Sequence, residues 1–207
     1  KTTIVKLLTR LYDPDEGRIL VDGIDLREIA LDDLQRHVGA IFQDFVRYHM
    51  TAAENIGIGR VERIEDRPRI VDAAQRSVAH ELIESLPQGY EQMLGRMFVA
   101  GLDLSGGEWH KIAIARAYFR DAGLLILDEP TAALDARAEA AIFARFRNLS
   151  ETSTALLISH RFATVRMADR ILVLENGAIL ESGSHEELMA LGGRYAELFE
   201  LQVEGFQ

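Results

Sequence analysis

Residues 125–130, Leu-Ile-Leu-Asp-Glu-Pro, constrain the fold of this chain more than any other stretch. Three consecutive apolar residues fit a strand buried on both faces, as in a parallel sheet covered by helices, and Pro130 cannot continue the sheet. In an open α/β sheet the carboxyl ends of the strands form the ligand-binding edge, so Asp128 and Glu129 are candidate site residues. The alternative is a strand that ends in a solvated acidic turn.

Asp128 and Glu129 are adjacent, and successive side chains of a strand point to opposite faces of the sheet. The two carboxylates therefore cannot do the same work. One can hold a metal ion, directly or through water, while the other orients or deprotonates a water molecule. Hydrolysis of a magnesium-bound phosphate requires this division of roles.

The composition fits a folded domain and argues against several functional classes. With 207 residues and 48% hydrophobic content, the chain suffices for one α/β domain, or one domain with a small lobe. A net charge of −10 and the absence of any block of lysines and arginines argue against nucleic acid as the main partner. The absence of cysteine excludes disulfides and thiolate metal sites. No apolar run approaches the roughly 20 residues that a membrane span needs.

The first residues have the pattern of a helix start. An i, i+3, i+4, i+7 stripe predicts a helix packed on a core, and it consists of Ile4, Leu7, Leu8 and Leu11. Lys1, Thr2 and Thr3 open this helix as the last residues of the motif G-x-x-x-x-G-K-[ST] do, in which the lysine reaches phosphates and the hydroxyl binds magnesium. The glycines of that motif are absent from the sequence, and a solvated helix start is the alternative. Because Lys1 is not a methionine and already lies inside an element, we expect the N-terminus to be cut.

Two further strands are predicted to end in polar side chains. The apolar stretch 38–42 is followed by Gln43, and the apolar stretch 154–158 is followed by Ser159 and His160. Taken singly, such a glutamine is usually a loop residue and such a histidine usually serves the structure. Together with the acidic strand, they predict several polar groups at strand ends, where an α/β sheet binds its ligands.

A serine and two glycines precede another predicted helix. Ser105, Gly106 and Gly107 come shortly before a helical pattern that runs from Trp109 to Arg120. Ser105 stands at the N-cap position, and the glycines leave backbone amides uncovered at the positive end of the helix dipole. This arrangement predicts an anion site, although an ordinary serine cap with flexible glycines would have the same sequence.

The remaining segments predict hairpins and helices. Asp22-Gly23 and Asn176-Gly177 are typical two-residue turns between short strands. Thr51 and Glu54 have the spacing of a capping box, which begins a helix. The loop 44–50 is rich in aromatic and apolar groups, and we expect it either to be buried or to dock a partner. Further helices are predicted at 31–36, at 64–86 with an interruption at Pro68, from Asp135 as N-cap to Leu149, and as one amphipathic segment at 185–201.

In this order along the chain, the motifs resemble those of the ATP-binding cassette (ABC) family. The resemblance covers essentially the whole chain, and its most specific part is the signature Leu-Ser-Gly-Gly with an acidic strand and a histidine after it. It implies an α/β fold with a P-loop NTPase-like core, a mainly parallel sheet, a helical signature subdomain and an antiparallel β-hairpin, with the first strands missing. The matching residues are Lys1-Thr2-Thr3, Gln43, Leu104 to Glu108, Leu125 to Glu129, Ala133-Leu134-Asp135 and His160.

The resemblance implies ATP and Mg²⁺ as ligands. By the family pattern, Lys1 would be the phosphate lysine, Thr2 would supply the magnesium hydroxyl, and Thr3 would contact phosphate. Asp128 would hold Mg²⁺, generally through water. Gln43 would contact Mg²⁺ and sense the attacking water at the γ-phosphate.

The other matches concern hydrolysis and assembly. Glu129 would be the general base, and His160 would hold the γ-phosphate and the transition state. In the family two cassettes meet head to tail, so Ser105, Gly106 and Gly107 would close on ATP bound to a partner cassette, and Asp135 would cross the same interface. The partner cassette could be identical or a different chain.

The segments 99–116, 184–188 and 195–201, with the loop after Gln43, resemble bacterial exporter-type half-transporters. In that branch a six-helix membrane domain precedes the cassette on the same polypeptide. We therefore expect an upstream membrane domain, a place at the cytoplasmic face of the inner membrane, and a lipid, drug or peptide as cargo. The loop 44–50 would receive the coupling helices of the membrane domain. The expected domains are a catalytic core of residues 1–43 and 122–207 and a helical subdomain of residues 44–121.

Two stretches depart from the family pattern. Glu108 replaces the common glutamine and brings a negative charge near a phosphate site. Residues 94–101 lack the Val-Gly-Glu pattern usual in exporters, which leaves the coupling route through them open. Two other functions fit the same motifs: a soluble ABC ATPase that acts on a macromolecule, and a regulatory cassette that does not hydrolyse ATP.

Overall fold

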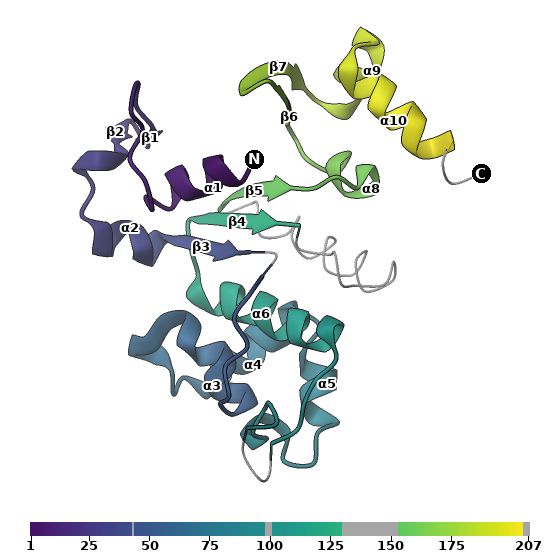
Figure 1. The fold of residues 1–207 in the computed structure, drawn as a ribbon. Helices are drawn as coiled ribbons and strands as arrows, with labels where there is room; N and C mark the ends of the chain where they lie inside the picture. Colours follow the sequence, from purple (N-terminus) through teal and green to yellow (C-terminus); the bar gives the residue numbers. More distant parts are fainter. Residues whose placement is uncertain (43, 98–100, 130–152, 205–207) are drawn as a thin grey trace. The chain divides into compact units, whose positions relative to one another are not determined.

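The computed structural model describes residues 1–42, 44–97, 101–129 and 153–204 (Figure 1). The chain divides into two compact units, one formed by Thr2–Leu156 and the other by Leu157–Gln207 together with Lys1. The helix predicted between Asp135 and Leu149 lies outside the described residues. No helix in the described ranges is long and apolar enough to cross a membrane.

The first unit alternates helices with short strands. Its elements are α1 (Thr2–Leu8), β1 (Leu20–Val21), β2 (Ile24–Asp25), the 3-10 helix η1 (Leu26–Glu28), α2 (Leu31–His37), β3 (Val38–Ile41), α3 (Ala52–Gly57), η2 (Ile58–Arg63, kinked at Arg60), α4 (Arg67–Arg76), α5 (His80–Glu84), η3 (Gly89–Glu91), α6 (Gly106–Arg120) and β4 (Leu124–Asp128). Strand β5 (Thr154–Ile158) crosses into the second unit, which continues with α8 (Phe162–Val165), β6 (Ile171–Glu175), β7 (Ala178–Gly183), α9 (His185–Leu191) and α10 (Arg194–Glu204).

A three-stranded sheet in the order β3-β4-β5 forms the centre of the α/β arrangement. Strands β3 and β4 are parallel, with Val38 opposite Leu124 and Ile41 opposite Leu127. Leu125, Ile126 and Leu127 are buried, as their uninterrupted apolar run predicted. The predicted strand 125–127 and its neighbour at 38–42 are therefore confirmed, and the chain leaves both strands at the same edge of the sheet.

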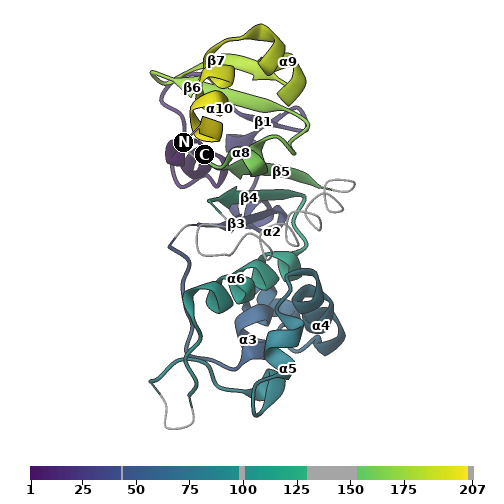
Figure 2. The same ribbon diagram turned by 90° about the vertical axis from the view of Figure 1, so that its right-hand side faces the viewer.

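Helix α6 lies between the sheet and the helices that follow β3. It packs against β3 on one side and against α3 and α4 on the other, and Figures 1 and 2 show it between these layers. A helix that is apolar on nearly all sides is typical of such a central position. Its buried residues are Trp109, His110, Ile112, Ala113, Ile114, Ala115, Ala117, Tyr118 and Phe119.

Both predicted hairpins are present, and their turns have the expected backbone. Asp22 and Gly23 between β1 and β2 have φ values of 50° and 83°, and Asn176 and Gly177 between β6 and β7 have values of 51° and 81°. Two successive positive φ values match a type I′ turn, whose twist suits antiparallel strands. Both strand pairs are antiparallel.

Three helix predictions are wrong in detail. Pro68 does not interrupt a helix but stands in the first turn of α4, where a missing N–H costs nothing. The single helix predicted at 185–201 is two helices, because α9 ends at Gly192, whose φ is 65°. At the N-terminus α1 ends at Leu8 and buries Val5, while the predicted core residues Ile4 and Leu11 are exposed.

The second unit has its own small core. Ile171 of β6, Leu188 of α9 and Tyr195 of α10 are buried there. Phe162 of α8 meets Tyr195 and Phe199 edge to face, with ring centroids 5.4 Å apart in both pairs. Edge-to-face aromatic pairs stabilise such a core beyond the area they bury.

Candidate functional site

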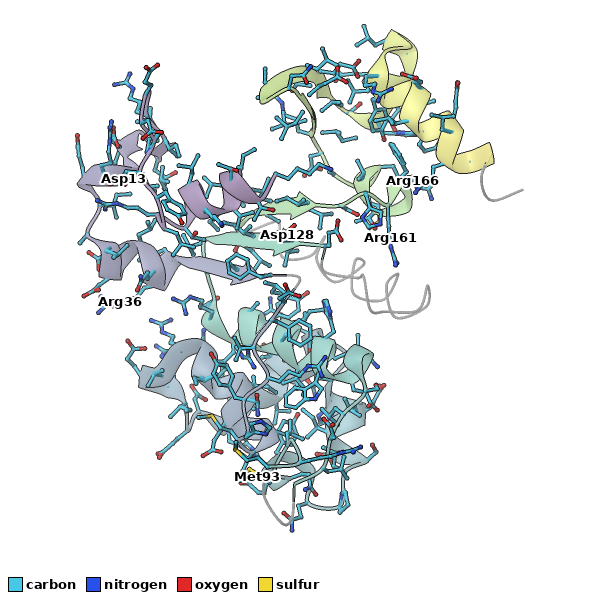
Figure 3. The ribbon with its side chains drawn as sticks, in the orientation of Figure 1. Asp13, Arg36, Met93, Asp128, Arg161 and Arg166 are labelled. Atoms are coloured by element: carbon cyan, nitrogen blue, oxygen red, sulfur yellow. The ribbon has the colours of Figure 1, made fainter. Side chains whose placement is uncertain are left out.

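The end of β4 carries the two candidate carboxylates. Asp128 is the last residue of the strand, and its side chain lies at the strand end in Figure 3. Asp128 and Glu129 are both half-buried. Glu129 has a φ of 50°, in the left-handed region that a residue with a Cβ seldom occupies. Such backbone strain costs about 1–3 kcal/mol and occurs preferentially at functional sites. The strained turn at Glu129 therefore supports a site at this strand end, and the sequence did not predict it.

The start of α1 is the second part of the site. Helix α1 packs against β4, anchored by the fully buried Val5. Thr2 and Thr3 in its first turn are exposed, as is Lys1 before it. The hydroxyl groups of Thr2 and Thr3 and the carboxylates at the end of β4 thus come from neighbouring elements, and their shared role in one site stays a prediction.

The hydroxyl and carboxylate oxygens of this region fit Mg²⁺, which prefers hard oxygen ligands. Among the described residues no three His, Cys, Asp or Glu side chains gather into a metal cage. Mg²⁺ bound to a nucleotide needs no such cage, because one or two protein oxygens, water and phosphate complete its shell. Thr2 and Asp128 supply that kind of donor.

Three predicted site residues stay untested by geometry. Gln43 and Asp135 lie outside the described residues. His160 follows β5 in the second unit and is exposed. Its backbone carbonyl accepts a hydrogen bond from Gln202 of α10 (3.4 Å), and the Oε1 of the same glutamine accepts one from the Phe162 N–H (3.0 Å). The roles of Gln43, Asp135 and His160 remain predictions.

The 105–107 turn begins helix α6 with a complete capping box. The Ser105 Oγ accepts a hydrogen bond from the Glu108 N–H (3.4 Å), and the Glu108 carboxylate accepts one from the Ser105 N–H (2.7 Å). The negative charge of Glu108 is therefore bound to its own helix end and complements the helix dipole. A glutamine at position 108 could make the same contact with the Ser105 N–H. The local structure is therefore the same with glutamate as with the glutamine that is common in the family. The buried Trp109 connects α6 to the chain just before the turn, because its indole N–H donates a hydrogen bond to Asp103 (3.2 Å).

Replacing Glu108 with alanine is expected to lower the free energy of unfolding by about 1 kcal/mol, because the Ser105 N–H loses its partner. Glu108→Gln keeps an acceptor at the same place and should stay within about 0.5 kcal/mol of the parent chain. Urea denaturation of the three proteins measures the difference. Equal destabilisation by alanine and glutamine would contradict the role of the cap and point to the charge itself.

The loop 44–50 is neither buried nor wholly exposed. Phe45 and Tyr48 are half-buried, whereas Val46 is 56% exposed. The loop borders a cavity of about 370 Å³, whose lining includes Val38, Phe42, Phe45, Tyr48, Ala113 and Arg116. The loop is thus partly buried and partly exposed, and its role in docking a partner stays a prediction.

Comparison with known proteins gives a consistent result. The family model described as "ABC transporter" matches residues 1–132. The ATP-dependent lipid A-core flippase of Chromohalobacter salexigens is 43% identical over 99% of the chain, which spans 34% of that protein. The subtilin transport ATP-binding protein SpaT of Bacillus subtilis is 42% identical over 97% of the chain and 33% of its own length.

A solved structure agrees in fold as well. A bacterial Atm1-family ABC exporter with ATP bound superposes with a TM-score of 0.90 and 40% identity over 98% of the chain, which covers 34% of the exporter chain. The chain thus spans about a third of the length of these relatives. The α/β fold with a parallel central sheet matches that of an ABC ATPase domain. Because the family model covers most of the chain, the chain belongs to the ABC transporter family, as an ATPase domain of the exporter type.

Proposed function

We propose that this chain binds ATP with Mg²⁺, hydrolyses the ATP and thereby powers the export of a lipid, drug or peptide across a membrane. The proposal rests above all on the end of β4, where a buried apolar strand delivers two adjacent carboxylates and a left-handed backbone turn. A general base beside a metal-holding carboxylate is what phosphoanhydride hydrolysis requires.

Each site residue has a proposed role in binding. Lys1 holds the outer phosphates, and Thr3 adds a hydroxyl contact to them. Thr2, Asp128 and Gln43 hold Mg²⁺, with Asp128 acting through water. When bound, Mg²⁺ neutralises charge on the phosphates and favours the departure of ADP.

Glu129 and His160 act on the reaction itself. Glu129 accepts a proton from water as the water oxygen bonds to the γ-phosphorus and the bond to the ADP oxygen breaks. His160 donates a hydrogen bond to the γ-phosphate oxygens, on which charge is spread in the transition state. Gln43 orients the attacking water.

The proposed assembly is a head-to-tail dimer of two cassettes. The 105–107 turn of each cassette closes on ATP held by the other, and Asp135 lies in the same interface. The exposed Ser105 and Gly106 support this arrangement, because a helix start at the surface can receive a phosphate from outside, which would compete with the Glu108 carboxylate for the Ser105 N–H. The partner cassette is the same chain or a related one.

The complete protein is proposed to carry a membrane domain upstream of this chain and to lie at the cytoplasmic face of the inner membrane. The named relatives are transport proteins and are about three times as long as the chain, which supports a further domain. The exposed Val46 beside the 370 Å³ cavity supports the loop 44–50 as the docking place of that domain. The helical subdomain of residues 44–121 and the core of residues 1–43 and 122–207 are the proposed domains, and the cluster of α3, α4 and α6 supports the former.

The test is ATP turnover by the complete protein in lipid nanodiscs. We expect phosphate release that depends on Mg²⁺. When the same protein is reconstituted in closed vesicles, we expect them to accumulate cargo only when ATP is present. ATP binding without phosphate release would instead favour a regulatory cassette. Turnover in a protein that proves to have no membrane segment would favour a soluble ATPase that acts on a macromolecule.

A further inference from the structure

Two side chains hold the turn that carries His160, one of them local and the other from helix α10. The Ser159 Oγ accepts a hydrogen bond from the Arg161 N–H (3.0 Å), which closes the backbone around His160. The Nε2 of Gln202 donates to the His160 carbonyl (3.4 Å), and its Oε1 accepts a hydrogen bond from the Phe162 N–H (3.0 Å). One amide group of α10 therefore fixes the chain just before and just after Arg161.

Gln202 also caps helix α8, which begins directly after this turn. Arg161 is the N-cap residue of α8, and its side chain makes no capping hydrogen bond. An arginine side chain offers only donors, so it cannot accept a hydrogen bond from the N–H groups of the first turn. The Gln202 Oε1 accepts from the Phe162 N–H instead, although Gln202 lies 40 residues further along the chain. The link between His160 and α8 thus depends on a distant side chain.

Aromatic side chains determine how α8 and α10 meet. Phe162 of α8 packs edge to face on Tyr195 and Phe199 of α10. Burial raises the pKa of the Tyr195 hydroxyl, as expected for a ring packed away from water. Positions 195, 199 and 202 are spaced i, i+4 and i+7, so the two rings and the Gln202 amide lie on the same face of α10. Gln202 therefore reaches the His160 turn from a helix face that is already packed on α8.

The start of α10 is attached to the hairpin of the same unit. The Glu181 carboxylate of β7 accepts hydrogen bonds from the N–H groups of Arg194 (2.5 Å) and Tyr195 (3.0 Å). A carboxylate at this end of a helix also complements the helix dipole. Helix α10 is therefore fixed to β7 at its start and to α8 along its length, and it supports Gln202 in a defined place.

We propose that Gln202 is a positioning residue for ATP hydrolysis, which acts by fixing the backbone that carries the His160 side chain. The inference rests on the proposed function, in which the His160 imidazole donates a hydrogen bond to the γ-phosphate in the transition state. Such a donor is most effective when it is already in place, because moving it during the reaction costs free energy. Gln202 supplies this preorganisation through its two backbone hydrogen bonds and contacts no substrate itself.

The test uses the complete protein with Gln202→Leu, which removes both hydrogen bonds and leaves a side chain of similar size. His160→Ala and the double variant that combines the two substitutions complete a double-mutant cycle. Gln202→Glu is a milder variant, because its carboxylate can accept from the Phe162 N–H but has no donor for the His160 carbonyl. Glu197→Gln is the matched control, since Glu197 is an exposed residue of α10 that pairs with Arg194 of the same helix (2.7 Å).

Gln202→Leu is expected to lower kcat about tenfold, since a small misplacement of a catalytic group has effects of this size or larger. The Kd for ATP should stay within about twofold, because the proposed contact of His160 strengthens only in the transition state. In the His160→Ala background, Gln202→Leu should cause less than about a twofold further loss of kcat. Amide hydrogen exchange should rise at Phe162. Gln202→Glu should have a kcat between those of the wild type and Gln202→Leu, and Glu197→Gln should keep the kcat of the wild type.

Several results would overturn the positioning role while the proposed function stands. They are an unchanged kcat in Gln202→Leu, an equal loss with and without the His160 side chain, or a loss of ATP affinity that matches the loss of kcat. Unchanged turnover in His160→Ala would also overturn it, because Gln202 would then have no catalytic group to position. A wild-type protein without any ATP turnover would refute the proposed function itself. If Gln202→Leu does not fold, Gln202→Glu in both backgrounds gives the same comparison.

Discussion

Glu129→Gln is expected to lower the ATP turnover of the complete protein by roughly 10²–10⁴-fold, the usual contribution of a general base. Glutamine has nearly the same shape as glutamate, but it cannot accept the proton of the attacking water. The left-handed backbone at position 129 does not depend on the carboxylate charge, so the turn after β4 should remain. ATP binding should persist, because removing a negative charge beside a triphosphate does not weaken the complex.

The same variant is expected to accumulate as a dimer in the presence of ATP and Mg²⁺, since closure follows binding while opening follows hydrolysis. Phosphate release, binding of a fluorescent ATP analogue and size-exclusion chromatography measure the three properties. Glu91→Gln is a suitable control, because Glu91 is exposed and pairs with Arg67 (2.8 Å) away from β4. Wild-type turnover in Glu129→Gln would show that Glu129 is not the base.

His160→Ala is expected to reduce turnover by about 10²–10³-fold, which is typical when one donor to a charged transition state is removed. ATP affinity should change little, because the contact to the γ-phosphate strengthens only as the phosphoryl group transfers. The fold around residue 160 should persist, since Gln202 contacts the backbone at His160 and Phe162, which the substitution leaves in place.

Single-turnover kinetics separates the chemical step from binding in this variant. His37→Ala is the control, because the His37 ring is exposed and contacts the Asp33 carbonyl within its own helix (2.8 Å). Equal losses of ATP affinity and turnover in His160→Ala would indicate damage to the fold. Unchanged turnover would mean that another group holds the γ-phosphate.

Local features of the fold were readable from the sequence because each has a local physical cause. The apolar run before Asp128 predicted a buried parallel strand, and Asp-Gly and Asn-Gly predicted the two hairpins. The capping box at Thr51 was readable from its spacing alone. Ser105 and Glu108 have the same spacing, so the role of Glu108 was open to prediction as well.

Helix boundaries and long-range contacts were less accessible. The two glycines at 192 and 193 contain the signal for the break between α9 and α10, but the apolar stripe continues through them. Arg116 contacts Asn55 and Val46, which precede it in the chain by 61 and 70 positions. No spacing rule links residues so far apart. The left-handed backbone at Glu129 has no residue signal either, because glutamate does not favour it.

For the site, the sequence predicted the residue types at strand ends and the structure locates part of them. Thr2, Thr3, Asp128 and Glu129 lie on packed elements of one unit. The resemblance to the ABC family implied the proposed roles of Gln43, Ser105, Asp135 and His160, which would depend on contacts with nucleotide and partner. Such contacts leave no trace in the periodicity of a single chain.

The backbone conformation of Glu129 has a consequence for which substitutions this position would accept. A glycine at position 129 would adopt a φ of 50° without steric cost and would relieve about 1 kcal/mol of backbone strain. A lineage that no longer needs ATP turnover should therefore drift toward glycine at this position and gain a more stable but inactive domain. Glu129 therefore keeps a backbone cost that a role for its carboxylate in hydrolysis would offset.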